Sequence, residues 1–147
     1  MTSLMKHIVV PVDGSEQAAR AALFAARLAS PHRAQITLLF VYDAPSAVNM
    51  GLAGLAGHEG LAEASRASAD AAFGAALAVM ADAVESEPTQ SLVVGNPAVE
   101  IIGFIQRSDV DLVVMGSRGM SSMEGLVMGS VSERVLRGAP CPVTVVR

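Results

Sequence analysis

The sequence predicts an α/β fold in which a five-stranded parallel sheet is covered by helices on both faces. Short β-branched runs alternate with longer helical patterns, which is typical of parallel sheets. The first of these runs is apolar throughout, as expected for a strand that is buried on both faces. The chain has 147 residues, 52% hydrophobic and 16% charged. One domain spanning residues 1–147 can therefore bury a substantial core.

The first strand is expected at residues 7–12, and a turn of Asp13, Gly14 and Ser15 follows it. Ser15 is a good N-cap residue, so a helix should begin directly after it. That helix is predicted over residues 16–29 because the Ser30-Pro31-His32 break follows. A second buried strand is predicted at 36–41.

Residues 43–60 are rich in Gly, Ala, Met and Ser without a consistent period, so a loop is expected there. From residue 61 to about 84, apolar residues recur at spacings of three and four, which predicts a helix. The remaining elements are a strand at 91–94, a helix after Gly95-Asn96-Pro97, a strand at 110–115, a glycine-rich loop at 116–128, a helix at 130–138 and a strand at 142–146.

The strand order follows from where the chemically distinctive loops must meet. Ligands of parallel sheets bind at the carboxyl ends of the strands, where the strand order reverses. Residues 13–15 follow the first strand, and the glycine-rich loop follows the fourth. These two loops can meet only if the first and fourth strands are neighbours. We therefore predict the order 3-2-1-4-5, with right-handed crossovers.

Composition and motifs exclude several classes of function. The only lysine, Lys6, precedes the first strand, so the lysine of a P-loop is missing. A dinucleotide fingerprint requires three spaced glycines after the first strand, where only Gly14 is present. The net charge of −4 and the 3% aromatic content disfavour a nucleic-acid partner.

No membrane partner is expected either. The longest segment without Asp, Glu, Lys or Arg, residues 44–58, contains a proline and three glycines, which do not suit a spanning helix. The first residues have no long apolar region, and the single cysteine, Cys141, cannot form an intrachain disulfide. We therefore expect a cytoplasmic protein, in which Cys141 is a small buried residue.

The glycine-rich loop carries the strongest functional pattern. Gly116-Ser117-Arg118-Gly119 is followed after nine residues by Gly129-Ser130, which opens the last helix. Glycines permit positive φ and a close backbone approach to a ligand, and a helix N-terminus attracts anions. The alternative is that Ser130 and Glu133 form a capping box and the glycines are turn residues. The pattern by itself leaves both interpretations open.

Asp13 is the second candidate residue, because it ends a buried strand at the expected switch point. Its carboxylate could accept hydrogen bonds from ribose hydroxyls or help to bind a metal ion. Alternatively, it is a turn aspartate that binds its own backbone. Its predicted proximity to the glycine-rich loop favours the functional interpretation.

The chain resembles the universal stress protein family over nearly its whole length. Residues 8–15, residues 114–119 and the run from Gly129-Ser130-Val131 to Val146-Arg147 carry the resemblance. It implies a Rossmann-like fold of the adenine nucleotide alpha hydrolase-like type, and usually a homodimer. The ATP-binding branch of the family has the pattern Gly-x2-Gly-x9-Gly-Ser/Thr, which is complete here.

The resemblance implies a set of binding residues for ATP, with Mg²⁺ as a possible companion ion. Asp13 would bind the ribose or adenine side, and the backbone at Val41 would meet the adenine edge. Gly129, Ser130 and Val131 would hold the phosphates. The full set of binding residues implied is Pro11, Val12, Asp13, Val41, Met115, Gly116, Arg118, Gly119, Gly129, Ser130 and Val131.

Three functional hypotheses remain open. The leading one is an ATP-binding sensor or regulator of the stress response, with slow hydrolysis at most and no assigned catalytic residue. The second is an ATPase or phosphotransferase. The third is a nucleotide-free interaction module that dimerises through the edge strand 142–146, whose apolar edge needs a cover or a partner.

Overall fold

The computed structural model describes residues 4–43, 57–119 and 128–147. The predicted loops at 43–60 and 116–128 therefore lie largely outside the described residues. The strands are β1 (His7–Pro11), β2 (Gln35–Tyr42), β3 (Thr89–Val94), β4 (Leu112–Gly116) and β5 (Val143–Val146). The helices are α1 (Glu16–Ala29), α3 (Gly57–Met80), α4 (Pro97–Arg107) and α5 (Ser130–Gly138), with short 3₁₀ turns η1 (Ser30–His32) and η2 (Ala81–Ala83).

The strands form one parallel sheet in the order β3-β2-β1-β4-β5, which confirms the predicted order. β1 lies in the centre, with Ile8 opposite Ile36 of β2 on one side and opposite Leu112 of β4 on the other. The loops after β1 and after β4 consequently leave the sheet next to each other.

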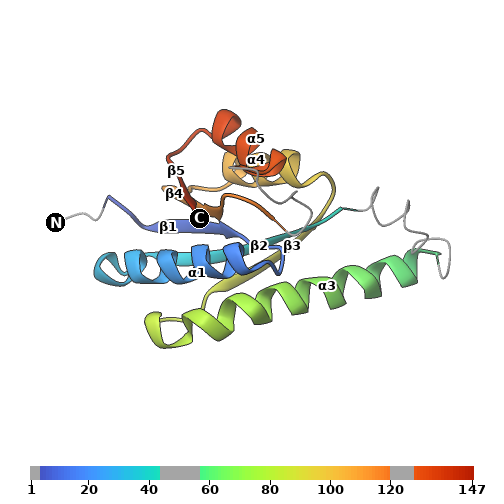
Figure 1. Cartoon of the computed structure of the whole chain (residues 1–147), viewed down its shortest axis with the longest axis horizontal. Helices are drawn as coiled ribbons and strands as arrows, with labels where there is room; N and C mark the ends of the chain where they lie inside the picture. Colours follow the sequence, from blue (N-terminus) through green and yellow to red (C-terminus); the bar gives the residue numbers. More distant parts are fainter. Residues whose placement is uncertain (1–3, 44–56, 120–127) are drawn as a thin grey trace.

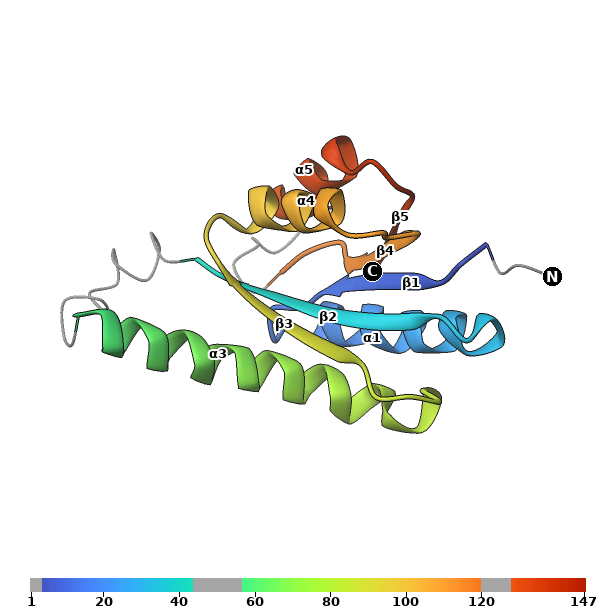
Figure 2. The same cartoon turned by 180° about the vertical axis from the view of Figure 1, so that it is seen from behind.

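Helices cover both faces of the sheet, as predicted. α1 and α3 lie on one face, and α4 and α5 lie on the other (Figure 1). Figure 2 shows the same layers from behind, with α3 running beside β2 and β3. The central strands β1, β2 and β4 are thus shielded from water on both sides, which explains their apolar sequences, whereas the edge strands β3 and β5 are half-buried or exposed.

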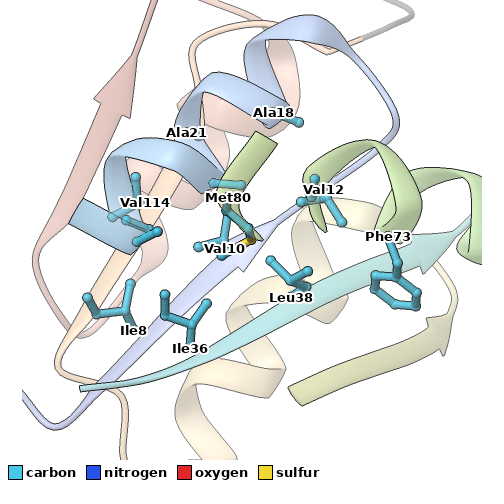
Figure 3. Close-up of a cluster of buried hydrophobic side chains, with 14 of the residues drawn as sticks. Ile8, Val10, Val12, Ala18, Ala21, Ile36, Leu38, Phe73, Met80 and Val114 are labelled. Atoms are coloured by element: carbon cyan, nitrogen blue, oxygen red, sulfur yellow. The ribbon is translucent and has the colours of Figure 1, made fainter. Parts of the chain in front are cut away.

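Two hydrophobic clusters fill the space between these layers. In the first, Ile8, Val10 and Leu38 face Ala21 of α1 and Met80 of α3 (Figure 3). In the second, alternate strand residues point towards α4 and α5; its buried members are Val9, Leu39, Ile101, Ile105, Val113, Met115 and Val135. Alanines on the inner face of α1 allow the helix to approach the sheet closely.

The helix boundaries agree with the sequence except in α3. Ser15 caps α1 as predicted, since its Oγ accepts a hydrogen bond from the Ala18 N–H at 3.2 Å. The predicted helix from residue 61 to about 84 instead begins at Gly57 and ends at Met80. Glycine lowers helix propensity but does not end a helix. Gly57 and Gly60 therefore lie inside α3, although the sequence pattern predicted a loop there. None of the described helices is long and apolar enough to cross a membrane.

Candidate functional site

A cavity of about 320 Å³ opens at the carboxyl ends of the strands. The ends of β1, β2 and β4 meet the first turns of α4 and α5 around it. All the binding residues expected from the sequence line this cavity: Pro11, Val12, Asp13, Val41, Met115, Gly116, Arg118, Gly119, Gly129, Ser130 and Val131. The neighbouring positions of β1 and β4 bring the two loops together, as the predicted strand order requires.

The lining also contains residues that the sequence did not indicate: Ala18, Leu39, Asp43, Pro97, Ile101 and Ser132. Asp43 follows β2 directly, as Asp13 follows the first strand, so its position was a signal that could have revealed it. Ile101 and Pro97 belong to α4, and only the crossover of that helix brings them to the cavity.

Charge is sparse in this cavity. Among the described lining residues, the ionisable side chains are Asp13, Asp43 and Arg118, whose formal charges sum to −1. Much of the remaining wall is apolar and comes from Leu39, Val41 and other core residues. Such a cavity suits a ligand that has both an apolar part and a polar part.

Asp13 shows both of the geometries that the sequence left open. Its Oδ1 accepts a hydrogen bond from the Ser15 N–H at 2.9 Å, which is the turn geometry of the simpler alternative. Its Oδ2 points across to the loop after β4, where a Cβ built on Gly119 would overlap it. The carboxylate therefore joins the two loops, and it lines the cavity at the same time.

The glycines of the motif allow neighbouring residues to approach the backbone closely, and they do not adopt an unusual backbone conformation. A Cβ on Gly116 would lie 3.0 Å from the Gln17 backbone and 3.2 Å from the Ala18 nitrogen. Gly129 has φ −78° and ψ 164°, which any residue can adopt. Positive φ occurs instead at Gly14 and Gly95, among the glycines that the structure describes. Of the two properties that glycine permits, the motif glycines therefore use close approach and not positive φ.

The two ends of the motif are joined through Ser117. Its carbonyl accepts a hydrogen bond from the Gly129 N–H at 2.6 Å, and its N–H donates to the Val146 carbonyl of β5 at 2.8 Å. Ser132 adds a further bond, because its buried Oγ donates to the Gly116 carbonyl at 2.8 Å. The loop is thus attached to both β5 and α5.

The first turn of α5 differs from the first turns of the other helices that border the cavity. Ser15 caps α1, and Asn96 caps α4 by accepting from the Val99 N–H at 3.2 Å. Gly129 is the N-cap of α5 and provides no side-chain hydrogen bond. The first N–H groups of any helix lack intrahelical acceptors. An anion in the cavity could accept hydrogen bonds from those of α5.

The capping-box alternative is wrong. Ser130 is the first residue of α5 and not its N-cap, and its side chain is exposed at the cavity. Glu133 binds Arg137 one turn later instead, with Oε1 accepting from the guanidinium at 2.9 Å. The Ser130 hydroxyl is therefore not used for capping.

Other notable side chains lie at the opposite end of the sheet. The Asp111 carboxylate accepts hydrogen bonds from the backbone N–H groups of Lys6 and His7 at 2.7 and 2.9 Å. These bonds lower the pKa of Asp111 below its ordinary value of 3.8. Partial burial, followed by the nearby charge of Asp111, raises the pKa of the Cys141 thiol. Cys141 is half-buried and not fully buried as expected, and a raised pKa disfavours the reactive thiolate.

Within the described ranges, no group of three or more His, Cys, Asp or Glu side chains is arranged to hold a metal ion. The cavity itself contributes two carboxylates, Asp13 and Asp43. Any divalent cation in this cavity would therefore need further oxygen ligands, which a bound phosphate could supply.

Comparison with known proteins identifies relatives that span nearly the whole chain. A sequence model of the universal stress protein family matches residues 5–147. A universal stress protein of Methanocaldococcus jannaschii is 33% identical over 145 residues, which cover 99% of this chain and 84% of that protein.

Solved structures show the same architecture. The universal stress protein UspA from Lactobacillus plantarum superimposes with a TM-score of 0.78 at 28% identity, covering 97% of both chains. A universal stress protein in complex with cAMP has a TM-score of 0.66 at 24% identity and covers 97% of both chains. One from Archaeoglobus fulgidus in complex with dAMP has a TM-score of 0.68 at 21% identity, covering 97% of this chain and 98% of that one.

Proposed function

Because the chain belongs to the universal stress protein family, we propose that its cavity binds ATP and that the protein acts as a nucleotide-dependent sensor or regulator of the stress response. The observation that carries this proposal is that the complete glycine pattern, Asp13 and the uncapped first turn of α5 border a single cavity. Two structural relatives contain the adenine nucleotides cAMP and dAMP, which supports an adenine nucleotide as the ligand.

The proposed orientation of the nucleotide follows the chemistry of the cavity wall. The adenine lies against the apolar residues near Val41, with the strand backbone meeting its edge, and Asp13 accepts hydrogen bonds from the ribose hydroxyls. The phosphates lie at Gly129, Ser130 and Val131, where N–H groups and the helix dipole favour negative charge.

The charge of the cavity supports binding of ATP as its magnesium complex. The described ionisable lining residues sum to −1, so a free triphosphate would meet little opposite charge apart from Arg118. Carboxylate and phosphate oxygens are the ligands that Mg²⁺ prefers. Chelation of Mg²⁺ should therefore weaken the binding of ATP much more than the binding of AMP.

We propose regulation and not rapid catalysis as the role of the nucleotide. Phosphoryl transfer needs both charge neutralisation and an oriented nucleophile. Arg118 could supply part of the former, but the described lining offers no histidine or lysine as a general base, only the carboxylates of Asp13 and Asp43. A high turnover of ATP by the purified protein would favour the ATPase alternative.

The proposed assembly is a homodimer that pairs through β5. The carbonyls of Pro142 and Val146 accept hydrogen bonds from Val113 and Ser117, so these groups face β4. By the alternation of a strand, the backbone groups of Val143 and Val145 face the open edge of the sheet. A second copy of the chain could pair with this edge and cover it.

Release of bound nucleotide and thermal melting together test ATP binding. Denaturing the purified protein should release adenine nucleotide, and adding Mg-ATP to the stripped protein should raise its melting temperature. A ligand at 100 times its Kd stabilises the folded state by about 2.7 kcal/mol. Gly129→Leu serves as the control, because its side chain would occupy the phosphate position and abolish the shift. If the wild-type protein releases no nucleotide and gains no stability, the proposal fails.

A further inference from the structure

Gln17 connects the first helix to the glycine loop without lining the cavity. It lies in the first turn of α1, and its side-chain Oε1 accepts two hydrogen bonds. One comes from the Ser117 hydroxyl at 2.9 Å, and the other comes from the Arg118 backbone N–H at 2.7 Å. Both donors belong to the loop after β4, a hundred residues further along the chain.

These two bonds engage both lone pairs of one amide oxygen, so the side chain has a defined orientation. Ser117 is only 2% exposed, and the loss of its partner would leave a buried hydroxyl unsatisfied. The Gln17 backbone also lies so close to Gly116 that a Cβ there would be only 3.0 Å away. The contact between α1 and the loop therefore allows little adjustment.

The same contact positions two groups at the cavity. Holding the Arg118 N–H fixes the backbone of Arg118, a residue that lines the cavity. Through its own carbonyl, Ser117 binds the Gly129 N–H at the start of α5. Gln17 thus acts on the cationic residue and, through a single intermediate residue, on the helix N-terminus.

We infer that Gln17 is a positioning residue for the phosphate end of the nucleotide site. This inference rests on the proposed binding of a nucleotide in the cavity. Gln17 determines how much the phosphate groups of the ligand contribute to its affinity, although Gln17 itself does not line the cavity. The nucleoside end is formed by other residues, such as Leu39, Val41 and Ile101, so the affinity for adenosine should not depend on Gln17.

The decisive measurement is the ratio of the Kd of adenosine to the Kd of AMP, obtained by calorimetry. Gln17→Met has a similar length but no acceptor, and we expect it to reduce this ratio about fivefold, which is the factor that corresponds to a net hydrogen-bond contribution of about 1 kcal/mol. The Kd of adenosine should remain within about twofold. Gln106→Met, at an exposed position of α4, is the matched control and should change neither value.

A second measurement needs no ligand. Hydrogen exchange of the Arg118 amide should be faster in Gln17→Met, because its acceptor is gone. Gln17→Glu keeps an acceptor oxygen and should restore protection. Ser117→Ala removes the other donor but keeps the bond to Arg118, so its effect on this amide should be small.

The outcomes separate the two proposals. If the wild-type protein binds neither adenosine, AMP nor Mg-ATP, nucleotide binding fails and the role of Gln17 fails with it. If the wild-type protein binds both adenosine and AMP and Gln17→Met leaves their ratio unchanged, only the role of Gln17 is overturned. An equal loss of affinity for adenosine and AMP would also overturn it, because that result indicates a general loss of structure.

Discussion

Single residues decide how closely the two loops of the site can approach. Gly116 and Gly119 lie in ordinary backbone conformations, yet a Cβ on Gly116 would make a tight contact with α1, and one on Gly119 would overlap the Asp13 carboxylate. Glycine is therefore required at these positions because a Cβ does not fit, and not because the backbone adopts a special conformation. The glycine spacing in the sequence cannot distinguish these two reasons. The sequence pattern identified these glycines, and the tertiary structure shows why glycine is needed there.

A pair of glycine substitutions tests this interpretation. Gly116→Ala should destabilise the protein by about 1–3 kcal/mol, because its methyl group meets the backbone of Gln17 and Ala18. Gly74→Ala is the matched control, since Gly74 is exposed inside α3 and a Cβ added there would have no other atom within 4 Å. The control should stabilise the protein by about 0.5–1 kcal/mol. Urea unfolding measures both, and equal effects would contradict the close-approach interpretation.

The hydrogen bonds of Asp111 predict that the stability of the protein depends on pH. Its pKa is lowered in the folded protein, chiefly by the hydrogen bonds from the Lys6 and His7 backbone, so the ionised form favours folding. This contribution is present above the unfolded pKa of about 3.9 and is lost as the pH falls through the folded pKa. Asp111→Asn should therefore lower the melting temperature at pH 7, and the difference should shrink below pH 4. A difference that persists unchanged in acid would contradict this account.

At the scale of elements, the helices that border the cavity differ in how they begin. α1 and α4 have side-chain caps, whereas α5 begins at a glycine without one. The caps Ser15 and Asn96 contribute to stability before any ligand binds. In the proposed function the phosphates bind at the first turn of α5, so stability and binding should respond to different substitutions.

Two alanine substitutions separate these roles. Asn96→Ala should cost about 1 kcal/mol of unfolding free energy, because α4 loses its cap. It should leave the Kd of Mg-ATP nearly unchanged, since Asn96 does not line the cavity. Ser130→Ala should instead raise the Kd of Mg-ATP and leave the unfolding free energy nearly unchanged, because Ser130 lines the cavity and its side chain makes no capping bond. Chemical denaturation and calorimetry on both variants provide the test. A loss of stability in Ser130→Ala that equals the loss in Asn96→Ala would contradict this division of roles.

At the scale of the whole molecule, β5 forms one edge of the sheet, and no other strand of the described residues pairs with its outer side. It is the last strand in the order, and residues 143–146 are all half-buried. Half-buried apolar residues at an unpaired edge favour association with a second chain. The proposed homodimer would cover this edge.

A charge at this edge tests the proposed dimer. Light scattering should give the wild-type protein twice the chain mass of 15.1 kDa. Val145→Lys should give the single-chain mass, because lysine on an edge strand opposes pairing. Val79→Lys is the control, since Val79 is 44% exposed on α3, away from β5, and should remain a dimer. A wild-type monomer, or a dimeric Val145→Lys, would exclude pairing through β5.

Local patterns in the sequence determined the order of the elements and most helix boundaries, and they marked Asp13 and the glycine-rich loop as candidates, whereas the full set of expected binding residues came from the family resemblance. Alternation of β-branched and helical segments, an N-cap serine and the spacing of glycines act over a few residues, so they can be read directly from the chain. The strand order was also predictable, because loops with matching chemistry had to meet at the switch point.

Only the tertiary structure decided how the site is held together. Gln17 and Ser117 are a hundred residues apart, and Ser132 reaches the carbonyl of Gly116 from another helix. Such contacts depend on crossover and register, and a side-chain amide or hydroxyl carries no local pattern that marks its distant partner. Ile101 likewise reaches the cavity only because α4 turns back over the sheet, whereas the position of Asp43 directly after β2 could have revealed it.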